Sequence, residues 1–321
     1  AKTSAKLEVD FRGSGTTYSL FRIRHVYFNL DWGKSALLVG QTWHPLYGDV
    51  APEILNLNMG APYQPFSRAP QIRYRFTSNN FMLTAAAIWQ SQYLSVGPKT
   101  NKPGENSTQK SQEFMKKSCV PEFYLGVDYK RPGLIAGAGL HVSSITPRTQ
   151  SETEDAVYFV NERVTGISGE AHVKYTKENW LVSAKTVLGT NLTQTSTVGG
   201  YGITSIDEVT GKQQYSPLRT SSTWVNVAYG KKWRPALFFG YLKNLGATKE
   251  VPYGALGTGT TLDQLFTGTA ELTYNIPHWK FGAEYSLCNA WYGDEFDAKA
   301  KAINSHSILN HRIVLVALFQ F

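Results

Sequence analysis

Apolar and charged positions alternate with a period of two along much of the chain. The segment FRIRHVYF places Arg22 and Arg24 on one parity and mostly apolar or aromatic side chains on the other. The segment QIRYRF repeats the arrangement with Arg73 and Arg75. Successive side chains of a β-strand point to opposite faces, so each segment predicts a strand with one apolar and one ionic face. On this parity His25 falls on the apolar face.

The alternating segments predict fourteen strands joined by two kinds of connection. The strands are residues 5–12, 18–32, 35–43, 70–78, 80–91, 120–131, 133–145, 157–177, 179–190, 213–231, 234–244, 264–275, 278–290 and 306–321. Short connections rich in Gly, Pro, Asn or Lys alternate with long ones, which are residues 44–69, 93–118, 146–155, 191–212, 246–262 and 292–305. Tight turns at one rim and long loops at the other are typical of an outer-membrane barrel.

The composition agrees with a membrane protein that crosses the bilayer with strands. The sequence has no run of eighteen apolar residues that could form a transmembrane helix. A transmembrane barrel has a modest mean hydropathy, here −0.28, because lipid-facing and lumen-facing side chains alternate. A soluble β-sandwich would instead bury one face of each strand. We predict an all-β fold, a transmembrane antiparallel up-and-down β-barrel in which residues 1–321 form a single domain.

Aromatic residues and the end of the chain indicate a location. Tyr129, Trp180 and Trp279 lie near short turns, as in the aromatic girdle of a membrane barrel. The last strand ends on Phe321, and a terminal aromatic residue resembles the recognition signal of barrels inserted into the outer membrane of Gram-negative bacteria. We therefore predict the bacterial outer membrane, with its lipid around the barrel.

The charged residues indicate what the predicted lumen could bind. The chain has a net charge of +8. The cations on the ionic faces form a predicted positive wall, which consists of Lys6, Arg12, Arg22, Arg24, Arg73 and Arg75. Guanidinium groups bind carboxylates and phosphates through paired hydrogen bonds, so this wall could hold anionic solutes. The alternative is a structural network in which the arginines pair with Glu8 and Asp10, and both roles can coexist.

The connection 44–69 has the composition of a loop that folds into the barrel. It contains four prolines, the apolar centre ILNLNM and only two acids, Asp49 and Glu53, and it ends beside Arg68. An exposed loop does not need an apolar centre, whereas a loop folded into the lumen packs that centre against the wall. We predict an inward-folded constriction loop with Asp49, Glu53 and Arg68 as its charged site residues.

Three segments of the N-terminal part resemble one porin family. FRIRHVYF, LLVGQTWHPLYGDVAPEILNLNMGAP and RAPQIRYRF resemble segments of the DcaP-like trimeric porins, with a similar R-x-R-H-x-Y strand, G-Q-T-W turn and R-x-P-Q-I-R-Y strand. The resemblance is specific over about residues 5–76. It implies sixteen strands, a homotrimer, a constricting third loop and a preference for small anionic solutes. Because fourteen strands are predicted, we expect two more ahead of Ala1, which would make 44–69 the third extracellular loop.

The predicted function is a porin for passive diffusion of small hydrophilic, preferentially anionic solutes. The sequence has no phosphate loop, metal-ligand spacing or nucleic-acid module, and Cys119 and Cys288 show no redox spacing. We therefore predict no enzyme, no cofactor, no metal and no nucleic-acid partner. His25 and His311 on apolar faces suggest a subunit interface, because contact with lipid would be costly. Two alternatives stay open: a plugged, non-transporting subunit of an outer-membrane complex, and a soluble ligand-binding β protein.

Overall fold

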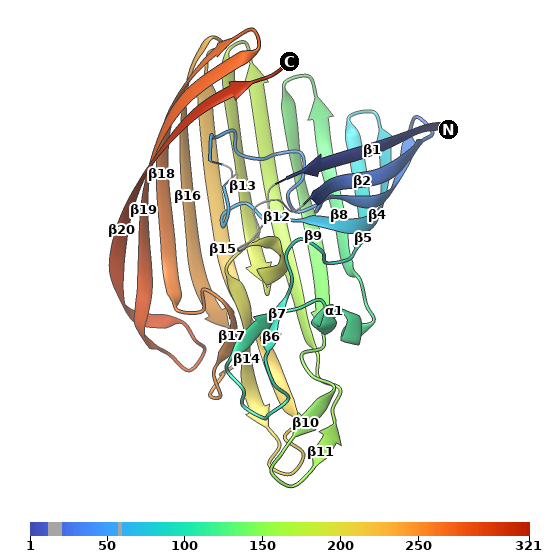
Figure 1. Ribbon diagram of the computed structural model, residues 1–321, viewed down its shortest axis with the longest axis vertical. Coiled ribbons are helices and arrows are strands. Elements are labelled where there is room, and N and C mark those ends of the chain that lie inside the picture. Colours follow the sequence, from blue (N-terminus) through green and yellow to red (C-terminus); the bar gives the residue numbers. More distant parts are fainter. Residues whose placement is uncertain (12–20, 57–59) are drawn as a thin grey trace.

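The computed structural model of the chain describes residues 1–11, 21–56 and 60–321, so the predicted site residue Arg12 lies outside the described residues. Within them, fourteen long strands pair antiparallel with their neighbours in chain order and form one curved sheet (Figure 1). They are β1 (Lys2–Asp10), β2 (Arg22–Asp31), β3 (Ser35–Trp43), β4 (Arg68–Ser78), β5 (Phe81–Ile88), β8 (Glu122–Arg131), β9 (Leu134–Ile145), β12 (Val164–Lys177), β13 (Trp180–Thr190), β15 (Gln213–Tyr229), β16 (Trp233–Ala247), β18 (Leu262–Ile276), β19 (Trp279–Phe296) and β20 (Ala302–Phe319). Each corresponds to one predicted strand, which confirms the up-and-down architecture.

The long connections contain short elements, which gather at the lower end of the sheet in Figure 1. They are β6 (Val96–Pro98), β7 (Thr108–Lys110), α1 (Glu113–Ser118), β10 (Gln150–Glu152), β11 (Val157–Phe159), the 3-10 turn η1 (Thr193–Thr195), β14 (Gly199–Ile206) and β17 (Ala255–Thr258). β14 and β17 bring the sheet to sixteen strands within the described residues. These pairings satisfy backbone groups that long loops would otherwise leave without partners. No helix in the described part of the chain is long and apolar enough to cross a membrane.

The two faces of the sheet differ as the alternation predicts. On the outward face, Ile72 and Leu125 are 56% and 54% exposed. On the inward face, Lys185 and Glu170 are buried. Water makes a broad exposed apolar face unfavourable, whereas lipid accepts it. This distribution is the reverse of a soluble β-sandwich and confirms the predicted transmembrane barrel.

A β-bulge shifts the alternation inside the second strand. The register of β2 against β1 changes by one residue at Arg24. Beyond it Val26 is exposed, while His25 is buried with Nδ1 3.0 Å from the hydroxyl oxygen of Thr42. The prediction that His25 lies on the outward apolar face is therefore wrong. A count with a period of two does not include the extra residue that a bulge inserts.

Several strand ends differ from the sequence prediction. The ladder of β19 and β20 continues to the pair Phe296 and Ala302, so their connection is residues 297–301 and not 292–305. β11 pairs with β10 and is separate from β12. β4 begins at Arg68, which belongs to the strand and not to the loop before it. These differences lie at the long-loop rim, where hairpin pairing sets the ends of strands.

Aromatic pairs flank the short turns. The ring centroids of Trp180 and Tyr229 are 4.7 Å apart, and those of Trp233 and Tyr274 are 4.5 Å apart. Each pair joins neighbouring strands of the sheet. Tyrosine and tryptophan combine an apolar ring with a polar edge, which suits the boundary between hydrocarbon and water. The pairs therefore lie where an interfacial girdle is expected.

Candidate functional site

The loop of residues 44–67 is anchored on the inner side of the sheet. Its first part lies against β13, where Lys185 Nζ donates to the carbonyl oxygens of Leu46 and Tyr47, both at 2.8 Å. Leu46 belongs to a buried apolar cluster that includes Val187. A buried ammonium group needs such acceptors because it has lost its water. Lys185 thus holds the loop backbone in place.

Glu53 attaches the middle of the loop to three strands. Its Oε1 is 2.8 Å from Lys174 Nζ on β12, and its Oε2 is 2.6 Å from Arg234 Nη2 on β16. The backbone N–H of Glu53 also donates to Asn226 Oδ1 on β15 at 2.9 Å. Charge-assisted hydrogen bonds of this length are among the stronger polar contacts. Glu53 therefore acts as an anchor of the loop in this structure.

Two wall carboxylates hold the tip of the loop. Glu271 on β18 and Glu284 on β19 are direct cross-strand partners. The backbone N–H of Leu55 lies 2.8 Å from Glu271 Oε2 and 2.9 Å from Glu284 Oε2, and the N–H of Asn56 donates to Glu284 at 3.1 Å. Neighbouring carboxylates repel each other, so shared donors between them are stabilising. The loop backbone supplies those donors.

The returning part of the loop packs on β15, β16 and β18. The Tyr63 hydroxyl lies 2.7 Å from Thr267 Oγ1, and its ring covers Gly240. The indole N–H of Trp224 donates to Gln64 Oε1 at 2.8 Å. The side chains of Tyr63, Gln64 and Trp224 are all buried. With the contacts above, the loop reaches from β13 to β19 across the inner side (Figure 1).

Arg22 and Arg24 are paired with acids of β1. Arg22 donates to both carboxylate oxygens of Asp10 at 2.9 and 2.5 Å. Arg24 Nε is 2.7 Å from Glu8, which is also 2.8 Å from Lys6 Nζ. These contacts have the geometry of the structural network that was the alternative to solute binding. Each side chain keeps part of its surface exposed, so the contacts do not seal it from the lumen.

Arg73 faces inward but makes contacts with its own wall. It is 7% exposed, and it donates through Nη2 to the carbonyl oxygen of Trp43 at 2.5 Å and through Nε to Gln71 at 2.8 Å. Neither of these two partners is an acid. The charge of Arg73 therefore adds to the local field while its donors hold the end of β3.

Asp49 of the loop lies between two wall cations. Its carboxylate is 2.5 Å from Lys130 Nζ and 3.7 Å from Arg75 Nη2. Burial disfavours the charged carboxylate, but Arg75 and Lys130 outweigh burial and lower the pKa of Asp49 below its ordinary value. Asp49 thus links the base of the loop to β4 and β8 as an ion.

Arg68 lies against an aromatic pair that the sequence interpretation did not identify. Its guanidinium carbon is 3.8 Å from the ring centroid of Trp43, and the Tyr47 ring stacks on Trp43 at 4.2 Å. Arg68 Nε also donates to His25 Nε2 at 3.4 Å. A cation over an aromatic face is stabilised by the negative charge density of that face. Arg68 is therefore a buried link between β2, β3 and the loop.

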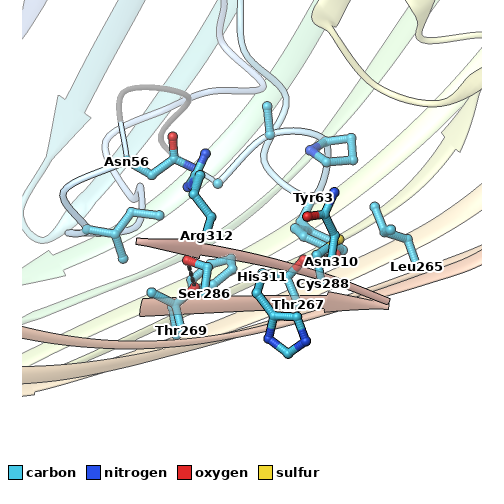
Figure 2. Close-up of a pocket in the computed structure, with 15 residues that line it drawn as sticks. Asn56, Tyr63, Leu265, Thr267, Thr269, Ser286, Cys288, Asn310, His311 and Arg312 are labelled. Atoms are coloured by element: carbon cyan, nitrogen blue, oxygen red, sulfur yellow. Dashed lines mark hydrogen bonds between the residues drawn. The ribbon is translucent and has the colours of Figure 1, made fainter. Parts of the chain in front are cut away.

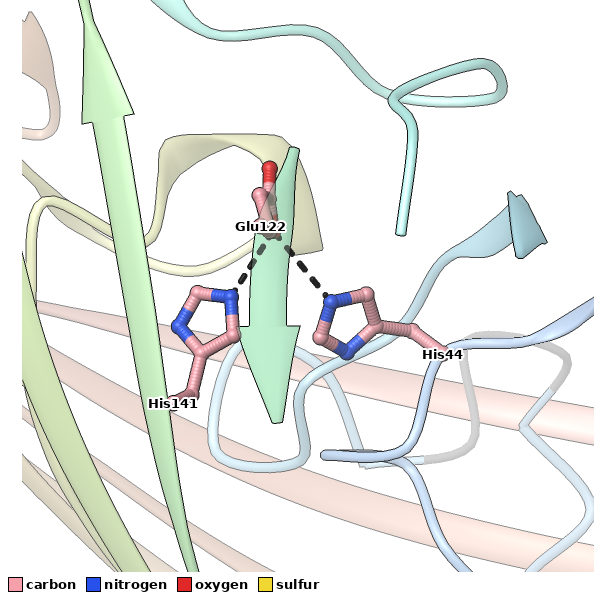
Figure 3. A group of neighbouring side chains, drawn as sticks. All are labelled: His44, Glu122 and His141. Carbon is pink, nitrogen blue, oxygen red and sulfur yellow. Dashed lines mark hydrogen bonds and ion pairs between the residues drawn. The ribbon is translucent and has the colours of Figure 1, made fainter. Parts of the chain in front are cut away.

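A buried cluster joins the start of the loop to the wall, and its composition resembles a metal-ligand set. Glu122 Oε2 is 3.3 Å from His44 Nε2 and 2.8 Å from His141 Nε2 (Figure 3). In the described part of the chain, these three residues could in principle hold a metal ion. Two histidines and a carboxylate suit zinc or iron.

The surroundings of this cluster favour a hydrogen-bonded anchor over a metal centre. The N–H of Leu46 donates to His44 Nδ1 at 3.2 Å, so the proton of that ring sits on Nε2 and points to Glu122. His141 Nδ1 is buried with no hydrogen-bond partner among the described residues. Histidines that bind metals usually donate their second N–H to an acceptor. Burial lowers the pKa of His44, although Glu122 opposes the shift.

Several of these anchors were not among the site residues predicted from the sequence. They are Glu122, His141, Lys185, Glu271 and Glu284. All lie at inward positions of predicted strands, so the alternation of apolar and polar positions could have identified them as lumen-facing residues. The alternation could not show which of these residues contact the loop, because those contacts depend on how distant strands are placed around it.

No protein-family model matches the chain, and no curated protein matches its sequence. Solved structures do match its fold. The outer membrane channel DcaP of Acinetobacter baumannii is 16% identical over 99% of this chain and 80% of the channel, with a TM-score of 0.69. The anion-selective porin from Comamonas acidovorans is 10% identical over 98% of this chain and 83% of the porin, with a TM-score of 0.53.

A third similar structure is the trimer form of OmpT, an outer membrane protein of Vibrio cholerae. It is 13% identical over 98% of this chain and 85% of that protein, with a TM-score of 0.53. Identities this low establish a shared fold. The resemblance of the N-terminal segments to DcaP-like porins is thereby confirmed at the level of the fold. The chain has the β-barrel fold of the outer-membrane porins.

Proposed function

We propose that the protein is a porin of the bacterial outer membrane that lets small hydrophilic, preferentially anionic solutes diffuse passively. The observation that carries the proposal is the loop 44–67, which is anchored from β13 to β19 on the polar side of a barrel whose other side is apolar. Such a loop narrows an aqueous lumen and so acts as a constriction. The function requires no reaction and no cofactor, and the porins and channels with the same fold support it.

The preference for anions follows from the charges on the inner side of the first four long strands. The cations are Lys6, Arg22, Arg24, Arg68, Arg73 and Arg75, and the acids that pair with them are Glu8, Asp10 and Asp49. Cations therefore exceed acids even after the observed ion pairs are counted. A positive lumen raises the local concentration of anions. The anion-selective porin with a similar fold supports the same preference.

We also propose a homotrimer within the outer-membrane lipid. The trimer form of OmpT, which shares the fold, supports this assembly. His311 lies on the outward side of β20, with Nδ1 2.7 Å from the hydroxyl oxygen of Tyr285 on β19. A polar pair on a lipid-facing surface is better accommodated at a subunit contact.

A plugged, non-transporting barrel is the second candidate, because a buried ion pair ties the long loops together. Arg148 Nη2 is 2.5 Å from Glu162 Oε1, and both side chains are fully buried. Arg148 also donates to the carbonyl oxygens of Asn101 and Gly211, both at 2.8 Å. Loops joined in this way could cover the lumen permanently.

Planar-bilayer recordings in a KCl gradient distinguish the candidates. An open porin gives stepwise conductance, and an excess of lumen cations gives a reversal potential on the anion side. Folded protein that inserts without conductance would establish the plugged barrel. Conductance with a cation-side reversal potential would retain the porin and reject the anion preference.

A further inference from the structure

The wall of the barrel carries an arginine on its outward, lipid-facing side. Figure 2 shows the two sides of the wall at β20, where Arg312 points toward the loop and His311 points the opposite way. On β15, Leu218 and Thr220 are buried on the inner side, so Arg219 between them points outward. A charged side chain in hydrocarbon is costly, so the surroundings of this arginine should compensate its charge.

A lysine on the neighbouring strand accompanies Arg219. Leu242 and Asn244 of β16 are buried, so Lys243 between them also points outward. Ser221 is directly opposite Lys243, and Arg219 is the next outward position along β15. Diagonal neighbours in a sheet are about 7–8 Å apart, which long side chains can span. One small anionic group can therefore contact both cations.

Both cations lie at the outer boundary of the hydrocarbon layer. Arg219 is ten residues along β15 from Tyr229, and Lys243 is ten residues along β16 from Trp233. Tyr229 and Trp233 belong to the aromatic pairs beside the short turns. A strand rises about 3.3 Å per residue and is tilted by about 35–45° in a barrel, so ten residues climb about 25 Å. This is about the height of the apolar band, which places both cations among the lipid headgroups on the long-loop side.

The protein itself compensates the charge of Arg219 only weakly. Its Nε and Nη2 donate to the carbonyl oxygens of Gly246 and Leu245 at 3.4 and 3.5 Å, which is long for a hydrogen bond. Arg219 forms no ion pair among the residues that the structure describes. Lys243 Nζ is paired with both carboxylate oxygens of Asp263 at 2.6 and 2.7 Å. Asp263 belongs to β18, two strands from Arg219 with Lys243 between them, so the three groups together stay positive.

We infer that this outward site on β15 and β16 binds the phosphate of an anionic lipid in the outer leaflet. A guanidinium has five N–H donors, and the two contacts above leave most of those of Arg219 for phosphate oxygens. Beneath the cations, Tyr241, Phe239 and Val225 are exposed and form an apolar surface on which acyl chains can lie. A free phosphate ion would gain nothing from that surface. β18 and β19 separate the site from β20, where the subunit contact is proposed, so lipid can reach it.

Native mass spectrometry of the full chain in an uncharged detergent tests the inference with dilauroyl phosphatidic acid, dilauroylglycerol and inorganic phosphate as probes. The phosphatidic acid should bind, and the other two should bind at least about tenfold more weakly, because one lacks the charge and the other lacks the acyl chains. Arg219→Gln should weaken binding of the phosphatidic acid about tenfold, and Arg219→Lys should retain more of it. Lys231→Gln is the matched control, because it removes a cation at the short-turn end of the same hairpin, and it should leave binding unchanged.

A second variant keeps the test decisive if Arg219→Gln does not fold. Lys243→Gln removes the other cation and leaves the Asp263 carboxylate without this partner, so the phosphatidic acid should again bind more weakly. Equal binding of phosphatidic acid and dilauroylglycerol, unchanged binding in a folded variant, or an equal loss in the Lys231 variant would overturn the inference. Inorganic phosphate that binds as tightly as the lipid would overturn it too, since the site would then hold a free ion. The inference goes beyond the proposed function, and its measurement requires no ion conduction, so either can fail without the other.

Discussion

The ring of Tyr63 lies so close to Gly240 that a Cβ atom at the glycine would come 2.5 Å from ring carbon Cδ2. Gly282 on β19 has the same relationship with the loop residue Leu55, because a Cβ there would be 2.6 Å from its Cδ1. Separations this short are not tolerated in a packed interior. The inner wall therefore receives two loop side chains at positions where it has no side chain of its own.

Gly240→Ala should displace the loop, because the rigid ring of Tyr63 occupies the space of the new Cβ. Gly282→Ala should displace it less, because Leu55 Cδ1 is the end of a flexible side chain that can rotate away. Overpacking of this kind costs about 1–3 kcal/mol, and we expect a larger and noisier single-channel conductance with the barrel still folded. Gly268→Ala on β18 is the matched control, because its nearest neighbouring atom would be 3.6 Å from the new Cβ. Identical conductance in all three variants would show that the loop does not narrow the lumen.

Removal of the arginine charges should change ion selectivity. The variant replaces four side chains by Gln: Arg22, Arg24, Arg73 and Arg75. Glu8, Asp10 and Asp49 then lose cationic partners, so the reversal potential in a KCl gradient should move toward the cation side. The difference from the parent protein should shrink at 1 M salt, where the Debye length is about 3 Å.

Lys231→Gln at the exposed short turn controls for removal of a distant charge. An unchanged reversal potential in the four-residue variant would assign the arginines to the structural network alone.

Acid should weaken the contribution of Asp49 to stability. The pKa of Asp49 is lowered from the ordinary value of 3.8, so the folded state favours the ionised carboxylate. Its contribution is complete above pH 3.8 and is lost as the pH falls through the lowered pKa. Urea unfolding of the parent and Asp49→Asn between about pH 5 and pH 2 measures this. The gap between the two should close in acid, and a constant gap would contradict the assignment.

The buried pair of Arg148 and Glu162 should dominate the stability of the joined loops. Arg148→Met leaves Glu162 charged and buried, which costs about 3–5 kcal/mol. The amide of Gln213, which donates to Glu162, should then exchange its hydrogen faster. The combined replacement Arg148→Met and Glu162→Leu should restore most of the protection of the Gln213 amide against hydrogen exchange. Lys99→Met, at an exposed position in the same group of loops, should change that exchange rate little.

Trimer formation should depend on the outer side of the first strands and the last strand. His311→Leu removes the polar pair with Tyr285, and we expect a lower trimer fraction by native mass spectrometry in mild detergent. Thr186→Val is the control, because Thr186 pairs with Thr223 on the outward side of the middle strands. Dissociation by the Thr186 variant alone would place the contact on the middle strands instead.

The wall of the barrel could be predicted from the sequence, because the alternation within each strand shows which of its faces contacts lipid and which contacts water. An apolar residue such as Ile72 is stable facing lipid, and its charged neighbour Arg73 is stable facing the aqueous side. This preference does not depend on the rest of the chain. All fourteen long strands followed from that alternation. The apolar centre and prolines of residues 44–69 likewise indicated a loop that packs against something, without indicating what.

The partners of the loop were decided only by the tertiary structure. Lys185, Glu271 and Glu284 meet backbone groups of the loop because distant strands are placed around it, and no short-range spacing records that placement. The inward position of His25 depends on a bulge, which the pairing of β1 with β2 creates. Alternation specifies the face of a side chain, but register between strands specifies its neighbours.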